Sequence, residues 1–337
     1  MSLTELWRIG DKLARCLEGS QFRPPVTYTG IDLGGTKLAA AAFSDDGKIL
    51  HRETVQISGL EGSAVGALVT DLARRYCDNH GSEGTGICIP GIYRSGAGTV
   101  WAPNIAGWDD YPLLHEVRAA APDSHRVTID SDRAAYILGE TWKGAATGAT
   151  DAIFIAVGTG IGAGILSGGR MIRGHGDVAG AIGWLGLDRP FAPRFVQHGC
   201  FEDQASGPGL VRVARDLMAQ DVDYNGALLD SADLTAAEIF AAHDGGDSIA
   251  LKVIDNAIEL WGMAAANLVS LFNPAMIVFG GGIFGPASKF LGRVAAEARR
   301  WAQPIAIQQV QIVASTLGSD AGLYGAGRLA MMNPEEI

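Results

Sequence analysis

Two segments of the chain share one pattern of hydrophobic and glycine positions. In the first, a mainly apolar run over residues 28–33 leads to a glycine turn, and a second apolar run over 38–43 ends at a hairpin turn over 44–47. In the second, apolar runs over 151–157 and 161–166 flank a glycine-rich turn and end at a hairpin turn over 167–169. Apolar runs of this length predict buried strands. The pattern therefore predicts two strand–turn–strand units, one in each half of the chain.

Apolar residues at helical spacing, and short apolar blocks between turn residues, predict the remaining elements. Helices are predicted over residues 3–17, 63–79, 133–142 and 249–271, and from Ala321 onward. Strands are predicted over 86–89, 127–130, 275–279 and 310–313. Residues 95–111 and 170–208 are predicted to be irregular. Strands that alternate with helices predict an α/β fold with a largely parallel sheet in each half.

The chemistry of the glycine turns depends on the element that comes after each turn. Glycine lets the backbone approach a phosphate group and direct N–H groups at it. A dinucleotide-binding fold continues from its glycine turn into a helix, whereas both turns here continue into a strand, and no window fits the P-loop pattern. With a third glycine turn at 280–282, the pair favours a clamp around the phosphates of a nucleotide. Each turn alone is also compatible with a glycine-rich hairpin that binds no ligand.

Composition and charge exclude several classes of function. The 337 residues are 47% hydrophobic and 19% charged, with 46 glycines and a net charge of −11, and they contain no apolar run long enough to span a membrane. A nucleic-acid-binding domain usually carries basic charge, so no nucleic-acid or membrane partner is expected. The cysteines Cys16, Cys77, Cys88 and Cys200 lack C-x-x-C spacing, which favours a reducing, cytoplasmic location.

Several motifs, in order and at specific spacing, resemble the ROK family of sugar kinases and sugar-responsive repressors, within the actin/hexokinase-like superfamily. The resemblance covers residues 29 to about 331 and rests on D-L-G-G-T-K at 32–37, A-P-N-I-A-G-W at 102–108, S-D-R-A at 131–134, G-T-G-I-G-A-G at 158–164 and G-G-G at 280–282. It implies a two-domain actin-like, ribonuclease H-like ATPase fold with a cleft between the lobes. The expected division is an N-terminal extension helix and linker over 1–25, a small lobe over 26–140 joined by the C-terminal helix 321–337, and a large lobe over 141–320.

The resemblance implies ATP- and Mg²⁺-dependent phosphorylation of a hydroxyl on a sugar or sugar-like polyol. A hydroxyl is a poor nucleophile near neutral pH, so a carboxylate that accepts its proton is required. Asp132, at a strand-to-helix junction, is the predicted catalytic base; an N-cap role for Asp132 is the structural alternative. Asp130 precedes the matching position and is not expected to be the base.

The resemblance also implies which residues bind the nucleotide. Asp32 is expected to help hold Mg²⁺, through water, and its structural alternative is a strand-end aspartate that caps a turn. The residues expected to contact ATP and its phosphates are Asp32, Gly34, Gly35, Thr36, Lys37, Gly158, Thr159, Gly160, Gly280, Gly281 and Gly282.

The acceptor site departs from the family pattern. The expected substrate contacts are Asn104, Ser131, Asp132, Trp184 and Glu202, although Asn104 also suits a tight loop with no ligand. The family's zinc motif retains only Cys200 of three thiolates, and Ala181 and Trp184 stand where the family has a glutamate and a histidine. No zinc site is therefore expected. Because a site that loses polar groups no longer rejects a substrate lacking the matching hydroxyl, a deoxy or substituted sugar or a cyclitol is expected rather than plain glucose.

A second interpretation stays open at this point. The same losses are compatible with a non-catalytic sugar-binding regulator that keeps the kinase fold. The retained Asp132 and both phosphate turns favour the enzyme. A homodimer is consistent with the family, but no residue pattern in the chain specifies it.

Overall fold

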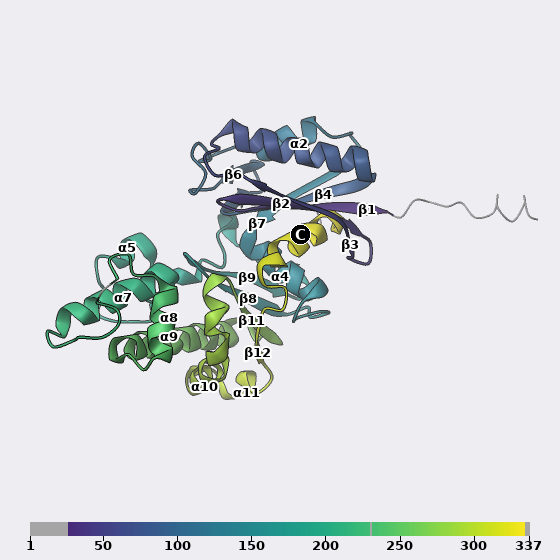
Figure 1. Ribbon diagram of the computed structural model, residues 1–337. Helices are drawn as coiled ribbons and strands as arrows, with labels where there is room; N and C mark the ends of the chain where they lie inside the picture. The colour runs from purple at the N-terminus through teal and green to yellow at the C-terminus, as the bar shows by residue number, and fades with distance from the viewer. Residues whose placement is uncertain (1–25, 230, 334–337) are drawn as a thin grey trace, which may run out of the picture.

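The computed structural model describes residues 26–229 and 231–333. The helix predicted over 3–17 lies outside these residues. Two five-stranded sheets, each with helices packed against it, form the two halves of the molecule (Figure 1). Within the part of the chain that is described, no helix is both long and apolar enough to cross a membrane.

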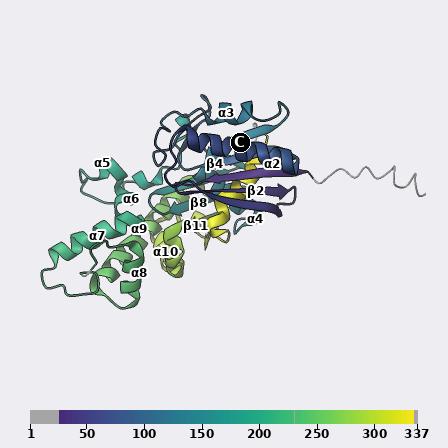
Figure 2. The same ribbon diagram turned by 45° about the horizontal axis from the view of Figure 1, so that its top comes forward.

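The first sheet has the strand order β3-β2-β1-β4-β7. Its strands are β1 (Thr27–Leu33), β2 (Lys37–Ser44), β3 (Ile49–Gln56), β4 (Ser82–Ile89) and β7 (Arg126–Ser131). The helices α2 (Ser63–His80) and α3 (Leu113–Ala119) cover its outer face (Figure 2). A small hairpin of β5 (Ile92–Arg94) and β6 (Thr99–Trp101) follows β4, so the segment predicted to be irregular over 95–111 contains a strand.

The second sheet repeats this arrangement with the order β10-β9-β8-β11-β12. Its strands are β8 (Ala152–Val157), β9 (Ile161–Ser167), β10 (Arg170–Met171), β11 (Met276–Gly280) and β12 (Gln311–Ala314). In both sheets the strands of the glycine hairpin pair antiparallel and the strands on the other side pair parallel. The prediction of largely parallel sheets was therefore wrong, because turns this short can only reverse the chain, whereas parallel pairing needs a long crossover.

Two helices, α4 (Asp132–Lys143) and α12 (Ala321–Met331), lie between the two sheets (Figure 1). Glycines allow this close packing: a Cβ on Gly86 in β4 would lie 2.0 Å from the carbonyl oxygen of Ala326, and one on Gly164 in β9 would lie 1.9 Å from that of Arg133. The C-terminal helix thus packs against the first sheet, although it follows the second sheet in sequence. The assignment of this helix to the small lobe stays a prediction.

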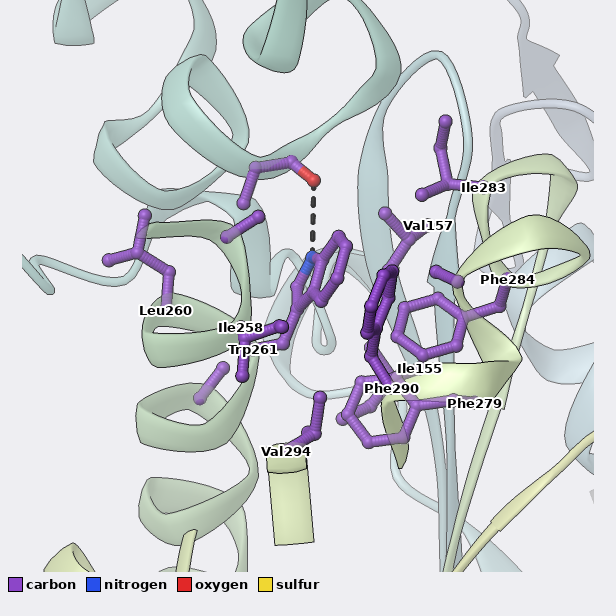
Figure 3. Close-up of a cluster of buried hydrophobic side chains, with 14 of the residues drawn as sticks. Ile155, Val157, Ile258, Leu260, Trp261, Phe279, Ile283, Phe284, Phe290 and Val294 are labelled. Carbon is purple, nitrogen blue, oxygen red and sulfur yellow. Dashed lines mark hydrogen bonds between the residues drawn. The ribbon is translucent and has the colours of Figure 1, made fainter. Parts of the chain in front are cut away.

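The core of the second half forms around the long helix α9 (Ser248–Phe272). Trp261 of α9 is fully buried, packs against Phe284 and donates a hydrogen bond from its indole nitrogen to the carbonyl of Ala205 at 3.1 Å (Figure 3). The side chain of Asp247 caps the start of α9, and Asn273 ends it in a left-handed conformation directly before Pro274. The prediction of this helix is confirmed.

The remaining helices complete the second half. They are α7 (Gly207–Gln220), α8 (Ala236–Asp244), α10 (Leu291–Trp301), α11 (Pro304–Ile307), and the short helices α5 (Phe195–His198), α6 (Cys200–Ala205), η1 (His175–Asp177), η2 (Ile182–Trp184), η3 (Gly282–Phe284), η4 (Pro286–Phe290) and η5 (Gly318–Asp320). Four of them, η1, η2, α5 and α6, fall within residues 170–208, which were predicted to be irregular. Each has six residues or fewer, too few to show a helical period in sequence.

Candidate active site

The first glycine turn connects β1 to β2. The N–H of Gly34 donates to the carbonyl of Lys37 at 2.9 Å and closes the turn, and Gly35, Thr36 and Lys37 are exposed. A Cβ on Gly35 would lie 3.9 Å from the Cβ of Asn104, so the turn lies beside this expected substrate contact. Exposed main-chain N–H groups at a turn are suited to an anionic ligand.

The second and third glycine turns are neighbours. The N–H of Gly158 donates to the carbonyl of Gly160 at 2.9 Å, and β8 runs parallel to β11, which ends at Gly280. Gly281 has a φ of 89°, and a Cβ there would lie 2.4 Å from the carbonyl oxygen of Val157. Only glycine can adopt this conformation in this space. The absence of a side chain keeps the turns open to a ligand.

A cavity of about 640 Å³ brings together residues that are far apart in sequence. The predicted site residues that line it are Asn104, Asp132, Gly158, Thr159, Gly160, Trp184, Glu202, Gly281 and Gly282. Within the described residues, the predicted ones outside this lining are Asp32, Gly34, Gly35, Thr36, Lys37, Ser131 and Gly280. Ser131 lines a smaller neighbouring cavity instead, and its side chain accepts a hydrogen bond from the N–H of Ala134 at 3.3 Å.

The start of α4 positions Asp132 in the large cavity. Ser131 is the N-cap residue, and Asp132 is the first residue of the helix, where its Oδ1 accepts a hydrogen bond from the N–H of Arg133 at 2.8 Å. The N-cap role considered for Asp132 therefore belongs to Ser131. Burial raises the pKa of Asp132 to about 6, against a smaller lowering effect of Arg133. This carboxyl group is ionised near pH 7 and can be protonated within the physiological range.

Asp32 lies in the first sheet, on a row of paired residues that leads to Asp130. Asp32 in β1 pairs with Cys88 in β4, and Cys88 pairs with Asp130 in β7. Burial raises the pKa of Asp32 to about 6, while a hydrogen bond with Cys88 and the charge of Lys37 oppose this rise. The charge of Asp32 also raises the pKa of Asp132. Two neighbouring carboxylates offer oxygen ligands of the kind that a divalent cation prefers.

Asp130 has a different environment. It is buried in an ion pair with Arg173, and its Oδ1 accepts a hydrogen bond from the N–H of Ser131 at 2.7 Å. Its charge is therefore already balanced by a protein cation, and Asp130 is absent from the lining of the large cavity. The geometry agrees with the expectation that Asp132, rather than Asp130, faces the substrate.

Glu202 and Trp184 lie on the large-lobe side of the cavity. Glu202 accepts a hydrogen bond from the N–H of Ile161 at 2.7 Å, and its pKa is raised by burial, against this hydrogen bond. Trp184, in η2, is 56% exposed although it lines the cavity together with Ala181. An exposed indole at the mouth of a cavity offers an apolar surface to a ligand ring.

Other residues of the cavity were not predicted from the sequence. Arg133 and Tyr136 of α4 line it, as do Trp101 of β6 and Val178. Arg133 directly follows the predicted base, so its proximity could have been inferred. Tyr136, four residues after Asp132, lies on the same face of the helix, which is a spacing that the sequence also contained.

The segment that matches the family's zinc motif forms α5 and α6. Asp203, 1% exposed, makes ion pairs with Arg194 at 2.8 Å and Arg212 at 3.0 Å. Across residues 26–229 and 231–333, no group of three or more histidine, cysteine, aspartate or glutamate side chains is arranged to hold a metal ion. The absence of zinc stays a prediction.

Comparisons with known proteins agree on one family. The model of the ROK family matches residues 28–333. A glucokinase from Halalkalibacterium halodurans is 32% identical over 321 residues, which cover 90% of this chain and 94% of the relative. The crystal structure of a ROK hexokinase from Thermus thermophilus superimposes with a TM-score of 0.75 at 28% identity, over 91% of this chain and 98% of that one.

A second solved structure includes ligands. A ROK family glucokinase from Streptomyces griseus, in complex with glucose and AMPPNP, is 29% identical with a TM-score of 0.71, over 91% of this chain and all of that one. These structural matches confirm the predicted two-domain actin-like ATPase fold.

Proposed function

The chain belongs to the ROK family and is a carbohydrate kinase, and we propose that it transfers the γ-phosphoryl group of ATP, with Mg²⁺, to a hydroxyl of a sugar or sugar-like polyol. The observation that carries this proposal is the cavity in which Asp132 lies with two glycine turns, Gly158–Gly160 and Gly281–Gly282, and with Glu202. A base, phosphate-binding turns and a polar acceptor contact in one cavity are the components that this reaction requires.

Asp132 acts as the general base. As the acceptor oxygen forms its bond to phosphorus and the bond to the β-phosphate oxygen breaks, the carboxylate takes the hydroxyl proton and ADP leaves. A pKa of about 6 keeps Asp132 mostly ionised at pH 7 and still basic enough to accept the proton. The transition state carries its charge on the phosphoryl oxygens, so main-chain N–H groups of the turns stabilise it electrostatically.

The nucleotide is held by the glycine turns of both lobes. Gly34, Gly35, Thr36 and Lys37 contact the phosphates from the small lobe, and Gly280 belongs to the adenosine-side turn of the large lobe. The exposure of the first turn and the small size of the residues at the second and third support these roles. Asp32 would help to hold Mg²⁺, through water, and its proximity to Asp132 supports this role. When bound, the cation would supply positive charge against the phosphates.

The acceptor lies against Asn104, Trp184 and Glu202, whereas Ser131 lies outside this cavity and caps α4. Ala181 and Trp184 give this part of the cavity an apolar surface, which supports a deoxy or substituted sugar or a cyclitol as the substrate. A panel of such compounds with ATP tests this finer proposal. A clear preference for plain glucose would contradict it.

The substitution Asp132→Asn tests the reaction itself. It should lower kcat by at least about 10³-fold, because the amide cannot accept the proton, while the affinity for the acceptor stays within a few-fold. The exposed Asp123, which lies outside the cavity, provides the matched control Asp123→Asn, with unchanged kcat expected. Full activity of Asp132→Asn would contradict the assignment.

A non-catalytic sugar-binding regulator is the second candidate, because Ala181 and Trp184 place little polarity at the acceptor site. Binding of sugars without phosphoryl transfer to any acceptor would favour it. The cytoplasmic location and the homodimer stay predictions.

A further inference from the structure

Arg133 is a cation of the cavity to which the proposed reaction gives no role. It follows Asp132 on the first turn of α4 and lines both the large cavity and the smaller one beside it. A Cβ on Gly162 of β9 would lie 2.6 Å from Cδ of Arg133 and 3.7 Å from the carbonyl oxygen of Gly180. The aliphatic stem of Arg133 therefore packs over Gly162 of β9.

The acidic groups around Arg133 already have other partners. Asp130 forms its ion pair with Arg173, and Asp177 accepts hydrogen bonds from the N–H and hydroxyl of Ser95 at 3.0 and 3.1 Å. Glu202 accepts its hydrogen bond from the main chain of Ile161. The charge of Arg133 lowers the pKa of Asp132 and of Asp130, but the hydrogen bond that Asp132 accepts comes from the main-chain N–H of Arg133 and not from its guanidinium.

Arg133 is thus a partly buried cation that no protein carboxylate binds directly. Among the described residues, its guanidinium makes no hydrogen bond and no ion pair within 4.0 Å, and Arg133 lines a cavity that also contains Asp132. A guanidinium that no protein carboxylate binds directly is available to an anionic group of a ligand in the cavity. Ala181, with its small side chain, leaves room in the same cavity.

We propose that Arg133 is a specificity-determining residue that binds a carboxylate substituent of the acceptor, so that the substrate is a sugar acid or a carboxylated cyclitol. This inference rests on the proposed kinase function and names the substituent that distinguishes its substrate. The planar fork of a guanidinium matches the two oxygens of a carboxylate, and such charge-assisted pairs are stronger than neutral hydrogen bonds. Arg133 orients the acceptor while Asp132, the preceding residue, receives the proton.

The test compares matched neutral and acidic acceptors. Glucose and glucuronate, which share the ring and differ at one carbon, are assayed with ATP and wild-type protein, with glucose 1-phosphate as a phosphate-bearing third acceptor. We expect kcat/KM for glucuronate to exceed that for glucose by about 10- to 100-fold. The substitution Arg133→Ala should abolish this ratio, Arg133→Lys should restore part of it, and the exposed control Arg299→Ala should leave it unchanged.

A binding measurement separates failure of this inference from failure of the kinase proposal. Calorimetric titration of wild-type protein and of Arg133→Ala with glucuronate and glucose, without ATP, requires no turnover. Tighter binding of glucuronate that depends on Arg133 supports the inference even if no phosphoryl transfer occurs. Equal binding of both sugars overturns it, and so does a preference for glucose 1-phosphate over glucuronate. An equal loss of kcat with every acceptor in Arg133→Ala also overturns it, since Arg133 would then act on the transferred phosphoryl group.

Discussion

Glu202 accepts a hydrogen bond from the N–H of Ile161 at 2.7 Å, which joins a carboxylate on α6 to the strand that leaves the second glycine turn. A Cβ on Gly160 would lie 2.9 Å from the same carboxylate oxygen. The contact therefore couples the acceptor side of the cavity to a turn that is proposed to bind phosphate. One side chain connects the two halves of the site.

Replacing Glu202 with glutamine tests the role of its charge at the acceptor. The amide oxygen of Glu202→Gln can still accept from Ile161, so the fold should be kept, but the charge that binds an acceptor hydroxyl is lost. We expect the KM for the acceptor to rise about tenfold, with the KM for ATP changed less than about twofold. Steady-state kinetics with each substrate varied in turn measure both values. Glu83→Gln, at an exposed position, is the control, and an unchanged acceptor KM in Glu202→Gln would contradict the prediction.

The raised pKa of Asp132 predicts an acidic limb in the pH dependence of the reaction. Because the base must be ionised and its pKa is about 6, log(kcat/KM) should fall with a slope of about one below pH 6 and be level above it. Initial rates from pH 5 to 8, with substrate concentrations below KM, measure this. A profile that stays level down to pH 5 would exclude Asp132 as a base with this pKa.

Asp32 should lower the stability of the ligand-free protein at high pH. Its pKa is about 6 in the folded chain and 3.8 ordinarily, so the folded state holds more protons between these values. The contribution of Asp32 to stability is therefore fully present below pH 3.8 and is lost as the pH rises through 6. We expect Asp32→Asn to be more stable than wild type by on the order of 1 kcal/mol at pH 8, and this gain should shrink towards pH 4.

Thermal unfolding of both proteins at the two pH values, without nucleotide or Mg²⁺, measures this effect. The conservative variant Asp32→Glu keeps the charge and should lack the gain at pH 8. A variant Asp32→Asn that is less stable than wild type at pH 8 would show that Asp32 contributes favourable contacts larger than its burial cost.

Gly281 tests the requirement for glycine at the third turn. A methyl group in Gly281→Ala would meet the carbonyl of Val157 at 2.4 Å, in a backbone conformation with a φ of 89° that alanine adopts only with strain. We expect at least a tenfold weaker affinity for ATP and a stability loss of about 1–3 kcal/mol. In Gly292→Ala, on the exposed side of α10 with nothing within 4 Å, stability should rise by up to about 1 kcal/mol.

The ion pairs of Asp203 should support the segment that carries the zinc motif in the family. Purified protein should contain no stoichiometric zinc, and a chelator should leave its unfolding temperature unchanged. The substitution Asp203→Asn should lower the free energy of unfolding by about 3 kcal/mol, because it leaves Arg194 and Arg212 without the buried carboxylate that pairs with both. Metal analysis that finds about one zinc per chain would refute the expectation that the protein binds no zinc.

Local patterns in the sequence predicted much of this fold correctly. Continuous apolar runs and glycine turns specified the hairpins of β1–β2 and β8–β9, and helical spacing with Pro274 specified α9. Such features depend on residues that are neighbours in the chain, and they can therefore be predicted from the sequence. The family motifs also pointed to Asp132 and Glu202, which the cavity brings together.

Only the tertiary structure decided the contacts between distant residues. The register that aligns Asp32 with Cys88 and Asp130, and the pairing of Asp130 with Arg173, depend on strands and helices meeting across the molecule. The packing of α12 against the first sheet and of the Arg133 stem against Gly162 have the same origin. Charges become buried and paired only when the core assembles. The sequence therefore shows which residues are present, but not the environment that each of them has in the folded protein.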